Sequence, residues 1–122
     1  MRLLLDTHTL VWWDEGKLPR AAVALIQDAD AVFVSAATAW EIAIKASLGK
    51  LKFAASIERV VAAYGFEPLA IELKHAQRVR TLAKHHRDPF DRMLIAQAIE
   101  ESLSLVSRDP MLERYPVSVL WE

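Results

Sequence analysis

The amino-acid sequence predicts an α/β protein in which helices cover both faces of a central parallel sheet of about five strands. Short apolar runs alternate with helical patterns along the whole chain of 122 residues. Within each run the apolar residues are largely consecutive, which is typical of parallel strands buried on both faces. Hydrophobic residues make up 53% of the sequence, so a chain of this length can bury a core without disulfide bonds.

Five runs predict the strands. The third run contains Pro68, which cannot donate a hydrogen bond to a neighbouring strand, so we expect it at an edge of the sheet. The other four runs contain no proline and can pair on both sides. The predicted strands are 3–5, 31–34, 67–71, 103–106 and 117–121.

Helical patterns fill the segments between these runs. Residues spaced three and four apart from Asp91 to Ile99 give the last helix an apolar stripe. Trp40 extends a similar stripe to Leu48 and is expected in the core. Three of the helices are followed by a glycine, where a left-handed C-terminal cap is expected (Gly16, Gly49, Gly65). The predicted helices are 7–15, 20–28, 37–48, 55–64, 72–86 and 89–102.

The composition excludes several classes of protein. The chain has no cysteine, so it has no disulfide framework and no thiolate metal site. Neither a GxGxxG nor a P-loop pattern is present, which argues against dinucleotide or nucleoside triphosphate binding. No apolar run approaches the ~20 residues of a membrane span, and Asp6 falls where a secretory signal would stay apolar. We therefore expect a cytoplasmic protein with no membrane partner.

Polar side chains directly follow three of the predicted strands. Asp6 and Thr7 follow the first strand, Ser35 follows the second, and Ser107 and Asp109 follow the fourth. Open α/β sheets bind ligands beyond the carboxyl ends of their strands. The sequence therefore predicts that these groups meet at one edge of the sheet.

Two more acids, Glu41 and Asp91, lie near the starts of predicted helices and point along their apolar stripes. Burying a lone charge is costly, so each needs a cation or a proton. Two like charges ~4 Å apart repel by about 4 kcal/mol at an effective dielectric constant of 20. Mg²⁺ or Mn²⁺ relieves this repulsion through oxygen ligands, and such a centre can support phosphodiester hydrolysis.

Helix capping offers a simpler explanation for several of these acids. Glu41 closes a capping box that starts at Thr38. Asp88 precedes Pro89 as an N-cap residue would, which puts Asp91 at the third helical position. Asp109 precedes a proline in the same way. Asp6 fits this explanation least well, because it ends a buried strand.

Basic residues concentrate between positions 74 and 92. Once the four candidate acids are set aside, twelve acidic residues face fifteen basic ones, a balance that a polyanionic substrate would favour. A solvated helix surface is the alternative explanation. Lys45 lies four residues after Glu41 and either pairs with it or holds a phosphate.

Four segments resemble the PIN-domain family, and most closely the VapC-type toxins of bacterial toxin–antitoxin pairs. Each segment alone is a weak signal, but the four occur in family order and span essentially the whole chain. They are LLLDTH (3–8), SAATAWEI (35–42), HRDPFDRMLIAQA (86–98) and LVSRD (105–109).

The resemblance implies a PIN-like Rossmannoid fold, with one nuclease domain over residues 1–122. It implies a metal-dependent endoribonuclease that uses Mg²⁺ or Mn²⁺, acts on RNA and is inhibited by a small antitoxin. Homodimers are usual in the resembled family. The resemblance maps the catalytic acids onto Asp6, Glu41, Asp91 and Asp109.

Each of these residues then has an expected role. Asp6 and Asp91 hold the principal metal and Asp109 completes its shell, while Glu41 binds metal or accepts a proton from the attacking water. Three hydroxyls orient these carboxylates (Thr7, Ser35, Ser107), although Thr7 and Ser35 can equally cap helices. Six residues are expected along an RNA path (Lys45, Lys84, His85, His86, Arg87, Arg92).

Three other functions compete with this one. A signalling receiver domain needs an acidic pair after the first strand and an aspartate after the third, and neither is present. A catalytically silent PIN-like binding module and a housekeeping PIN nuclease both stay open. A small antitoxin gene beside this one would favour the toxin.

Overall fold

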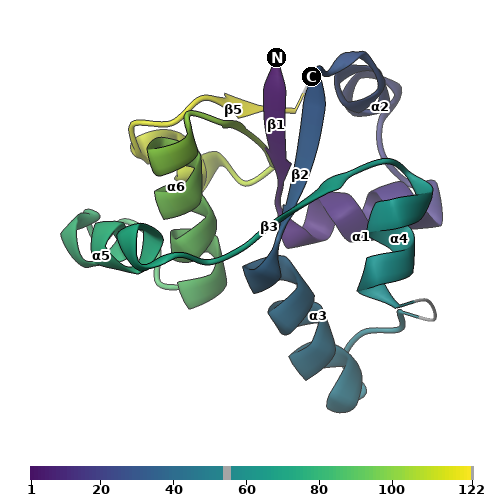
Figure 1. Ribbon diagram of the computed structural model, residues 1–122, viewed down its shortest axis with the longest axis horizontal. Coiled ribbons are helices and arrows are strands. Elements are labelled where there is room, and N and C mark those ends of the chain that lie inside the picture. Colours follow the sequence, from purple (N-terminus) through teal and green to yellow (C-terminus); the bar gives the residue numbers. More distant parts are fainter. Residues whose placement is uncertain (54–55, 122) are drawn as a thin grey trace.

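The computed structural model describes residues 1–53 and 56–121, in which five parallel strands form one sheet in the order β3-β2-β1-β4-β5 (Figure 1). All five predicted strands are present, and β3, which contains Pro68, lies at an edge as predicted. The strands are β1 (Arg2–Leu5), β2 (Ala31–Ser35), β3 (Glu67–Leu69), β4 (Ser104–Val106) and β5 (Val119–Leu120).

Helices connect the strands and form a layer on each face of the sheet. They are α1 (Thr7–Glu15), α2 (Arg20–Asp28), α3 (Ala36–Ser47), α4 (Ile57–Ala63), α5 (Leu73–Thr81) and α6 (Pro89–Glu101), followed by a short 3-10 helix, η1 (Pro110–Arg114). The predicted start of the fourth helix, at residue 55, lies outside the described residues, and η1 was not predicted. Within the described ranges, no helix is long and apolar enough to cross a membrane.

Two helix ends show what stops a helix in this chain. Gly16 ends α1 in the left-handed region, with φ 71°, and its N–H donates to the carbonyl of Trp13, as predicted. The fifth helix ends five residues earlier than predicted, at Thr81, because Leu82 turns into the core in an extended conformation. Residues 82–88 therefore form a connection between α5 and α6 rather than a helix surface.

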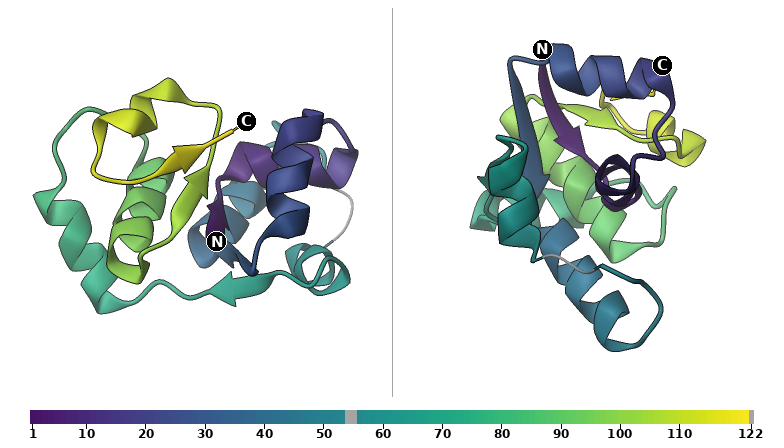
Figure 2. Two further views of the ribbon diagram at one scale, coloured as in Figure 1. Left: turned by 90° about the horizontal axis from the view of Figure 1, so that it is seen from above. Right: turned by 90° about the vertical axis from the view of Figure 1, so that its right-hand side faces the viewer.

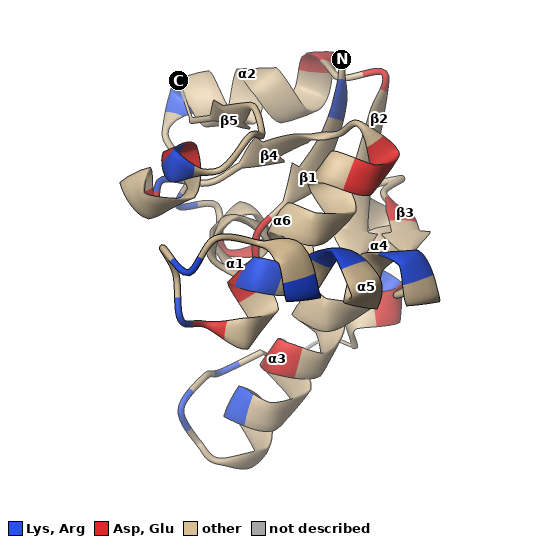
Figure 3. Ribbon diagram, turned by 90° about the vertical axis from the view of Figure 1, so that its left-hand side faces the viewer, with Lys and Arg blue, Asp and Glu red and all other residues tan. Residues whose placement is uncertain are grey.

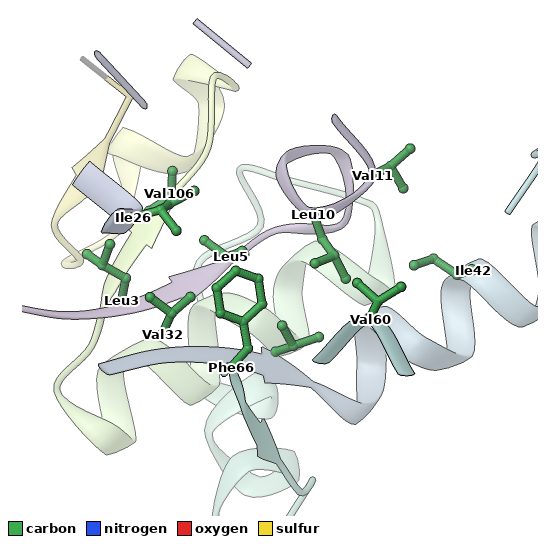
Figure 4. Close-up of a cluster of buried hydrophobic side chains, with 11 residues drawn as sticks. Leu3, Leu5, Leu10, Val11, Ile26, Val32, Ile42, Val60, Phe66 and Val106 are labelled. Atoms are coloured by element: carbon green, nitrogen blue, oxygen red, sulfur yellow. The ribbon is translucent and has the colours of Figure 1, made fainter. Parts of the chain in front are cut away.

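Strand β1 contributes to a hydrophobic cluster on each side of the sheet. Leu3 and Leu5 belong to the cluster that α1, α2 and α4 cover (Figure 4). Leu4 points the other way and belongs to the cluster that α6 covers. All three leucines are fully buried, and burying one such side chain contributes about 1.5–3 kcal/mol. This strand therefore fixes both helical layers to the sheet.

Trp40 is not in the core, which corrects the prediction. Its side chain is 61% exposed, and its ring meets that of Phe90 edge-on, with ring centroids 5.2 Å apart. The buried face of α3 instead runs through Ala37, Glu41 and Ile42. Leu48 is exposed as well, at the end of α3 that projects beyond the sheet (Figure 2).

The strand order reverses between β1 and β4. After β1 the chain adds β2 and β3 on one side, and it then crosses to add β4 and β5 on the other. Open α/β sheets bind their ligands in the crevice outside such a switch point. The residues that follow β1 and β4 are therefore the ones best placed to form a site.

Candidate active site

A cleft of about 660 Å³ lies beyond the carboxyl ends of β1 and β4. The four predicted catalytic acids all line it, although they come from four separate parts of the sequence. Asp6 follows β1, Glu41 lies on α3, Asp91 on α6, and Asp109 just after β4. Asp88 also lines this cleft, as do Lys45, Lys50 and Arg108.

Asp6 is both a buried acid of the cleft and a helix cap. It is 7% exposed, and its Oδ1 accepts a hydrogen bond from the backbone N–H of Thr9 at 2.8 Å. Burial raises the pKa of Asp6, while hydrogen bonds from Ser107 and Thr9 oppose the shift. The expectation that Asp6 fits a capping role least well was therefore wrong, because the chain passes directly from β1 into α1.

Two donors hold the carboxylate of Glu41, which is 5% exposed. The hydroxyl of Thr7 donates to Oε1 at 2.6 Å, and the ammonium of Lys45 donates to Oε2 at 2.6 Å. This hydrogen bond raises the pKa of Lys45. Lys45 thus forms the ion pair with Glu41 that was one of its two expected roles, and it still lines the cleft.

The capping box expected at Thr38 does not form. Helix α3 begins at Ala36, and its N-cap is Ser35, whose Oγ accepts from the N–H of Ala37. Thr38 therefore lies inside the helix. Of its two expected roles, Ser35 therefore has the capping one. Its hydroxyl donates to Oε1 of Gln97 at 2.6 Å, and not to a carboxylate of the cleft.

Asp88 and Asp91 lie one turn apart at the start of α6. Asp88 caps the helix as predicted, since its Oδ1 accepts from the N–H groups of Phe90 and Asp91. Burial raises the pKa of Asp91 to about 7; the negative charges of Asp88 and Asp6 add to the shift, and His86 opposes it. The cleft therefore has more negative charge than its own cations neutralise.

His86 lies between two of the acids, which the sequence did not predict. Its Nε2 is 3.2 Å from Oδ2 of Asp91 and 3.1 Å from Oδ2 of Asp109. Its Nδ1 accepts from the N–H of Asp88, which leaves the proton on Nε2 to donate to the carboxylates. The ring is therefore part of the acidic cluster. It also lines a pocket with Lys84, Arg87 and Arg92, and its expected place along an RNA path stays a prediction.

Asp109 is held by its own backbone as well as by His86. Its Oδ1 accepts from the N–H of Met111, which makes it the N-cap of η1, as the proline after it suggested. Its N–H donates to the hydroxyl of Ser107 at 3.1 Å. Ser107 thus positions Asp109 through its backbone N–H. A hydrogen bond from the Ser107 side chain also opposes the rise in the pKa of Asp6.

The comparison with protein families settles the fold. A model of the PIN domain matches residues 3–117. The chain belongs to the PIN-domain family. The sheet order and this match together confirm the predicted fold class.

Other proteins are similar to this PIN domain over almost their whole length. Ribonuclease VapC22 of Mycobacterium tuberculosis is 29% identical over 130 residues, covering 96% of this chain and 97% of the relative. VapBC2 from Rickettsia felis, solved with a fragment of promoter DNA, has a TM-score of 0.73 at 16% identity and covers 100% of both chains. DNA-bound VapBC from Salmonella typhimurium has a TM-score of 0.70 at 20% identity, covering 98% and 97%.

Four basic residues of this PIN domain lie on or beside the connection between α5 and α6. Lys84, His85 and Arg87 are exposed on the connection between α5 and α6, near the basic α5 (Figure 3). Arg92 is partly buried and lines one pocket with Lys84, His86 and Arg87, and its expected role in RNA binding stays a prediction. Its guanidinium donates to backbone carbonyls, including those of Val79 and Ala83, and thereby fixes the connection against α6.

The donor set of the cleft fits a hard divalent cation. The ligand atoms of His86, Asp91 and Asp109 lie within 4.8 Å of one another, and Asp6 lies close enough to Asp91 to raise its pKa. Carboxylate oxygens are the preferred ligands of Mg²⁺ and Mn²⁺. The raised pKa of Asp91 is the physical sign that a positive charge at this point would be favourable.

Proposed function

We propose that this PIN domain is a metal-dependent endoribonuclease and the toxin of a VapBC-type toxin–antitoxin pair. The observation that carries the proposal is the convergence of Asp6, Glu41, Asp91 and Asp109 on one cleft at the switch point of the sheet. The similarity to a protein named Ribonuclease VapC22 supports RNA as the substrate.

Asp6, Asp91 and Asp109 would hold the metal, for which Mg²⁺ is proposed first and Mn²⁺ second. When bound, such an ion supplies Lewis-acid stabilisation of the phosphodiester oxygens and lowers the pKa of water. The chain fixes these acids in advance, since Asp6 and Asp109 each accept a backbone hydrogen bond. Little rearrangement is then needed when substrate arrives.

Glu41 is the proposed proton acceptor for the attacking water. Thr7 and Lys45 fix the orientation of its carboxylate, and burial on α3 limits the access of bulk solvent. Lys45 is half-exposed beside the cleft, so its ammonium can also face a phosphate of the RNA. Thr7 and Lys45 would thus position Glu41 rather than react themselves.

The partner proposed for this chain is a small antitoxin protein, and the proposed assembly is a homodimer in the cytoplasm. The structures it resembles include VapBC complexes from three bacteria. Co-expression with the product of a small neighbouring gene should suppress RNA cleavage. Cleavage that continues at full rate in the presence of that product would favour a housekeeping nuclease.

Metal removal tests the proposed reaction directly. We expect purified protein to cleave single-stranded RNA with Mg²⁺ or Mn²⁺, to stop after EDTA treatment, and to recover when the cation is restored. Gel analysis of an end-labelled RNA measures all three states. Cleavage that persists after exhaustive metal removal would contradict the mechanism.

Lys84 and Arg87 are proposed to bind RNA phosphates. Lys84→Ala and Arg87→Ala should each weaken RNA binding and lower the log–log salt slope by roughly 0.7 for each phosphate that is no longer neutralised. Lys74→Ala is the matched control, because its ammonium already lies 2.7 Å from Glu101. If both variants bind RNA like the control at low and high salt, the connection between α5 and α6 takes no part in binding.

A further inference from the structure

Arg108 and Trp12 form a layered surface at the edge of the acidic cleft. The guanidinium carbon of Arg108 lies 4.5 Å from the centroid of the Trp12 ring, so the cation is stacked on the aromatic face. Both residues line the cleft that holds the four acids. Trp12 is only partly buried, and its inner side packs against the core cluster.

The packing around Trp12 explains why this surface is rigid. The ring of His8 meets that of Trp12 edge-on, with ring centroids 5.1 Å apart, and the ring of Trp121 is tilted against it at 6.4 Å. These contacts come from α1 and from the residue after β5. Trp12 therefore supports Arg108 from a fixed position.

Among the residues that the structure describes, no carboxylate takes up the charge of Arg108. Its side chain is exposed, and among residues 1–53 and 56–121 no acid lies within ion-pairing distance of it, although Asp109 is its neighbour in sequence. A guanidinium that is stacked on a ring rather than paired with an acid keeps its outer planar face available. Unpaired RNA bases stack on aromatic rings and on guanidinium planes of this kind.

We propose that Arg108, supported by Trp12, is a stacking platform for an unpaired RNA base next to the scissile phosphate. This inference rests on the proposed ribonuclease function and deepens it, because it names the residues that would hold a base of the substrate. The exposed Lys50, which lines the same cleft, can face the phosphate backbone of the stacked nucleotide. The cleft is large enough for a nucleotide, since ligand pockets typically occupy about 300–1,000 Å³.

The test compares two RNA probes in an Asp91→Asn background with EDTA, so that no probe is cleaved. One probe is octauridylate, and the other is an octamer with the same ribose-phosphate backbone and no bases. Arg108→Lys keeps the charge and removes the planar surface. We expect it to weaken octauridylate binding on the order of fivefold or more, the lower end for loss of one stacked base. Binding of the abasic octamer should change less than about twofold, because a phosphate contact needs only the charge.

Substitutions at Trp12 provide the matched pair. Trp12→Leu should reproduce the loss for octauridylate, and Trp12→Phe, which keeps a ring under Arg108, should retain most of the affinity. Equal losses of affinity for both probes would mean that Arg108 contacts only a phosphate, and would overturn the platform. Unchanged octauridylate binding in Arg108→Lys and Trp12→Leu would also overturn it, and would leave this surface to a protein partner. If the parent binds neither probe while the wild type cleaves single-stranded RNA with Mg²⁺, the platform is overturned and the proposed ribonuclease function stands.

Discussion

Asp6→Asn and Asp91→Asn are each expected to lower the rate of RNA cleavage by at least about 100-fold at saturating Mg²⁺. Each substitution removes a negative charge from the proposed metal shell. Mutation of a residue that merely supports a metal ligand already lowers metal affinity or activity about 10–100-fold. Mutation of a ligand itself should therefore lower the rate more. Single-turnover cleavage of a labelled RNA gives the rate, and metal titration separates weaker metal binding from slower chemistry.

The controls for this experiment lie outside the cleft. Asp28→Asn makes the same chemical change at an exposed acid at the end of α2, and it should leave the rate unchanged. Asp6→Asn should keep the fold, because asparagine is as good an N-cap as aspartate and still accepts from Thr9. Wild-type rates in both Asp6→Asn and Asp91→Asn would show that these acids have only structural roles at the starts of their helices.

The stability of the metal-free protein should fall as the pH rises. The pKa of Asp91 is about 7 in the folded state and 3.8 in the unfolded chain, so the folded chain holds a proton that the unfolded chain releases. The contribution of Asp91 to the unfolding free energy is therefore fully present below pH 3.8. It is lost as the pH rises towards and through 7. Linkage predicts a loss of about 2–3 kcal/mol between pH 5 and pH 8. Denaturant titrations in EDTA across this range measure it.

Asp91→Asn should flatten that dependence and stabilise the metal-free protein at pH 8. The relief of burial and repulsion exceeds the cost of losing a negative charge near a helix N-terminus, which is about 0.3–1 kcal/mol. Mg²⁺ at 100 times its dissociation constant should stabilise the wild type by about 2.7 kcal/mol and the variant far less. Asp28→Asn should behave like the wild type. A variant that is less stable than the wild type at pH 8 would assign Asp91 a structural role alone.

The sheet was predictable because its strands are short apolar runs separated by helical patterns. Leu3–Leu5 cannot form an amphipathic helix, and Pro68 excludes a central position for its strand. The end of α5 was not predictable in the same way. Residues 82–88 contain neither glycine nor proline, and the helix stops there because Arg92, from a later helix, binds the carbonyls of this connection. Only tertiary structure contains that information.

The acids of the cleft were predictable from their places after strands and on apolar stripes. The position of His86 was not, since it depends on a hydrogen bond from the N–H of Asp88 within an irregular connection. Gln97 offered a signal that was missed. It is a polar residue inside the apolar run of α6, it is fully buried, and it joins Ser35 to the carbonyl of Ala70.

Three acids of the cleft also cap helices, and this dual use has a genetic consequence. Asp6, Asp88 and Asp109 each accept backbone hydrogen bonds that asparagine accepts equally well. An aspartate codon becomes an asparagine codon by a single base change. Mutants selected for surviving a harmful activity of this chain should therefore include such changes at Asp6 and Asp109, recovered as folded protein at normal abundance. The protein can lose its activity in one mutational step without passing through an unfolded state that proteases would clear.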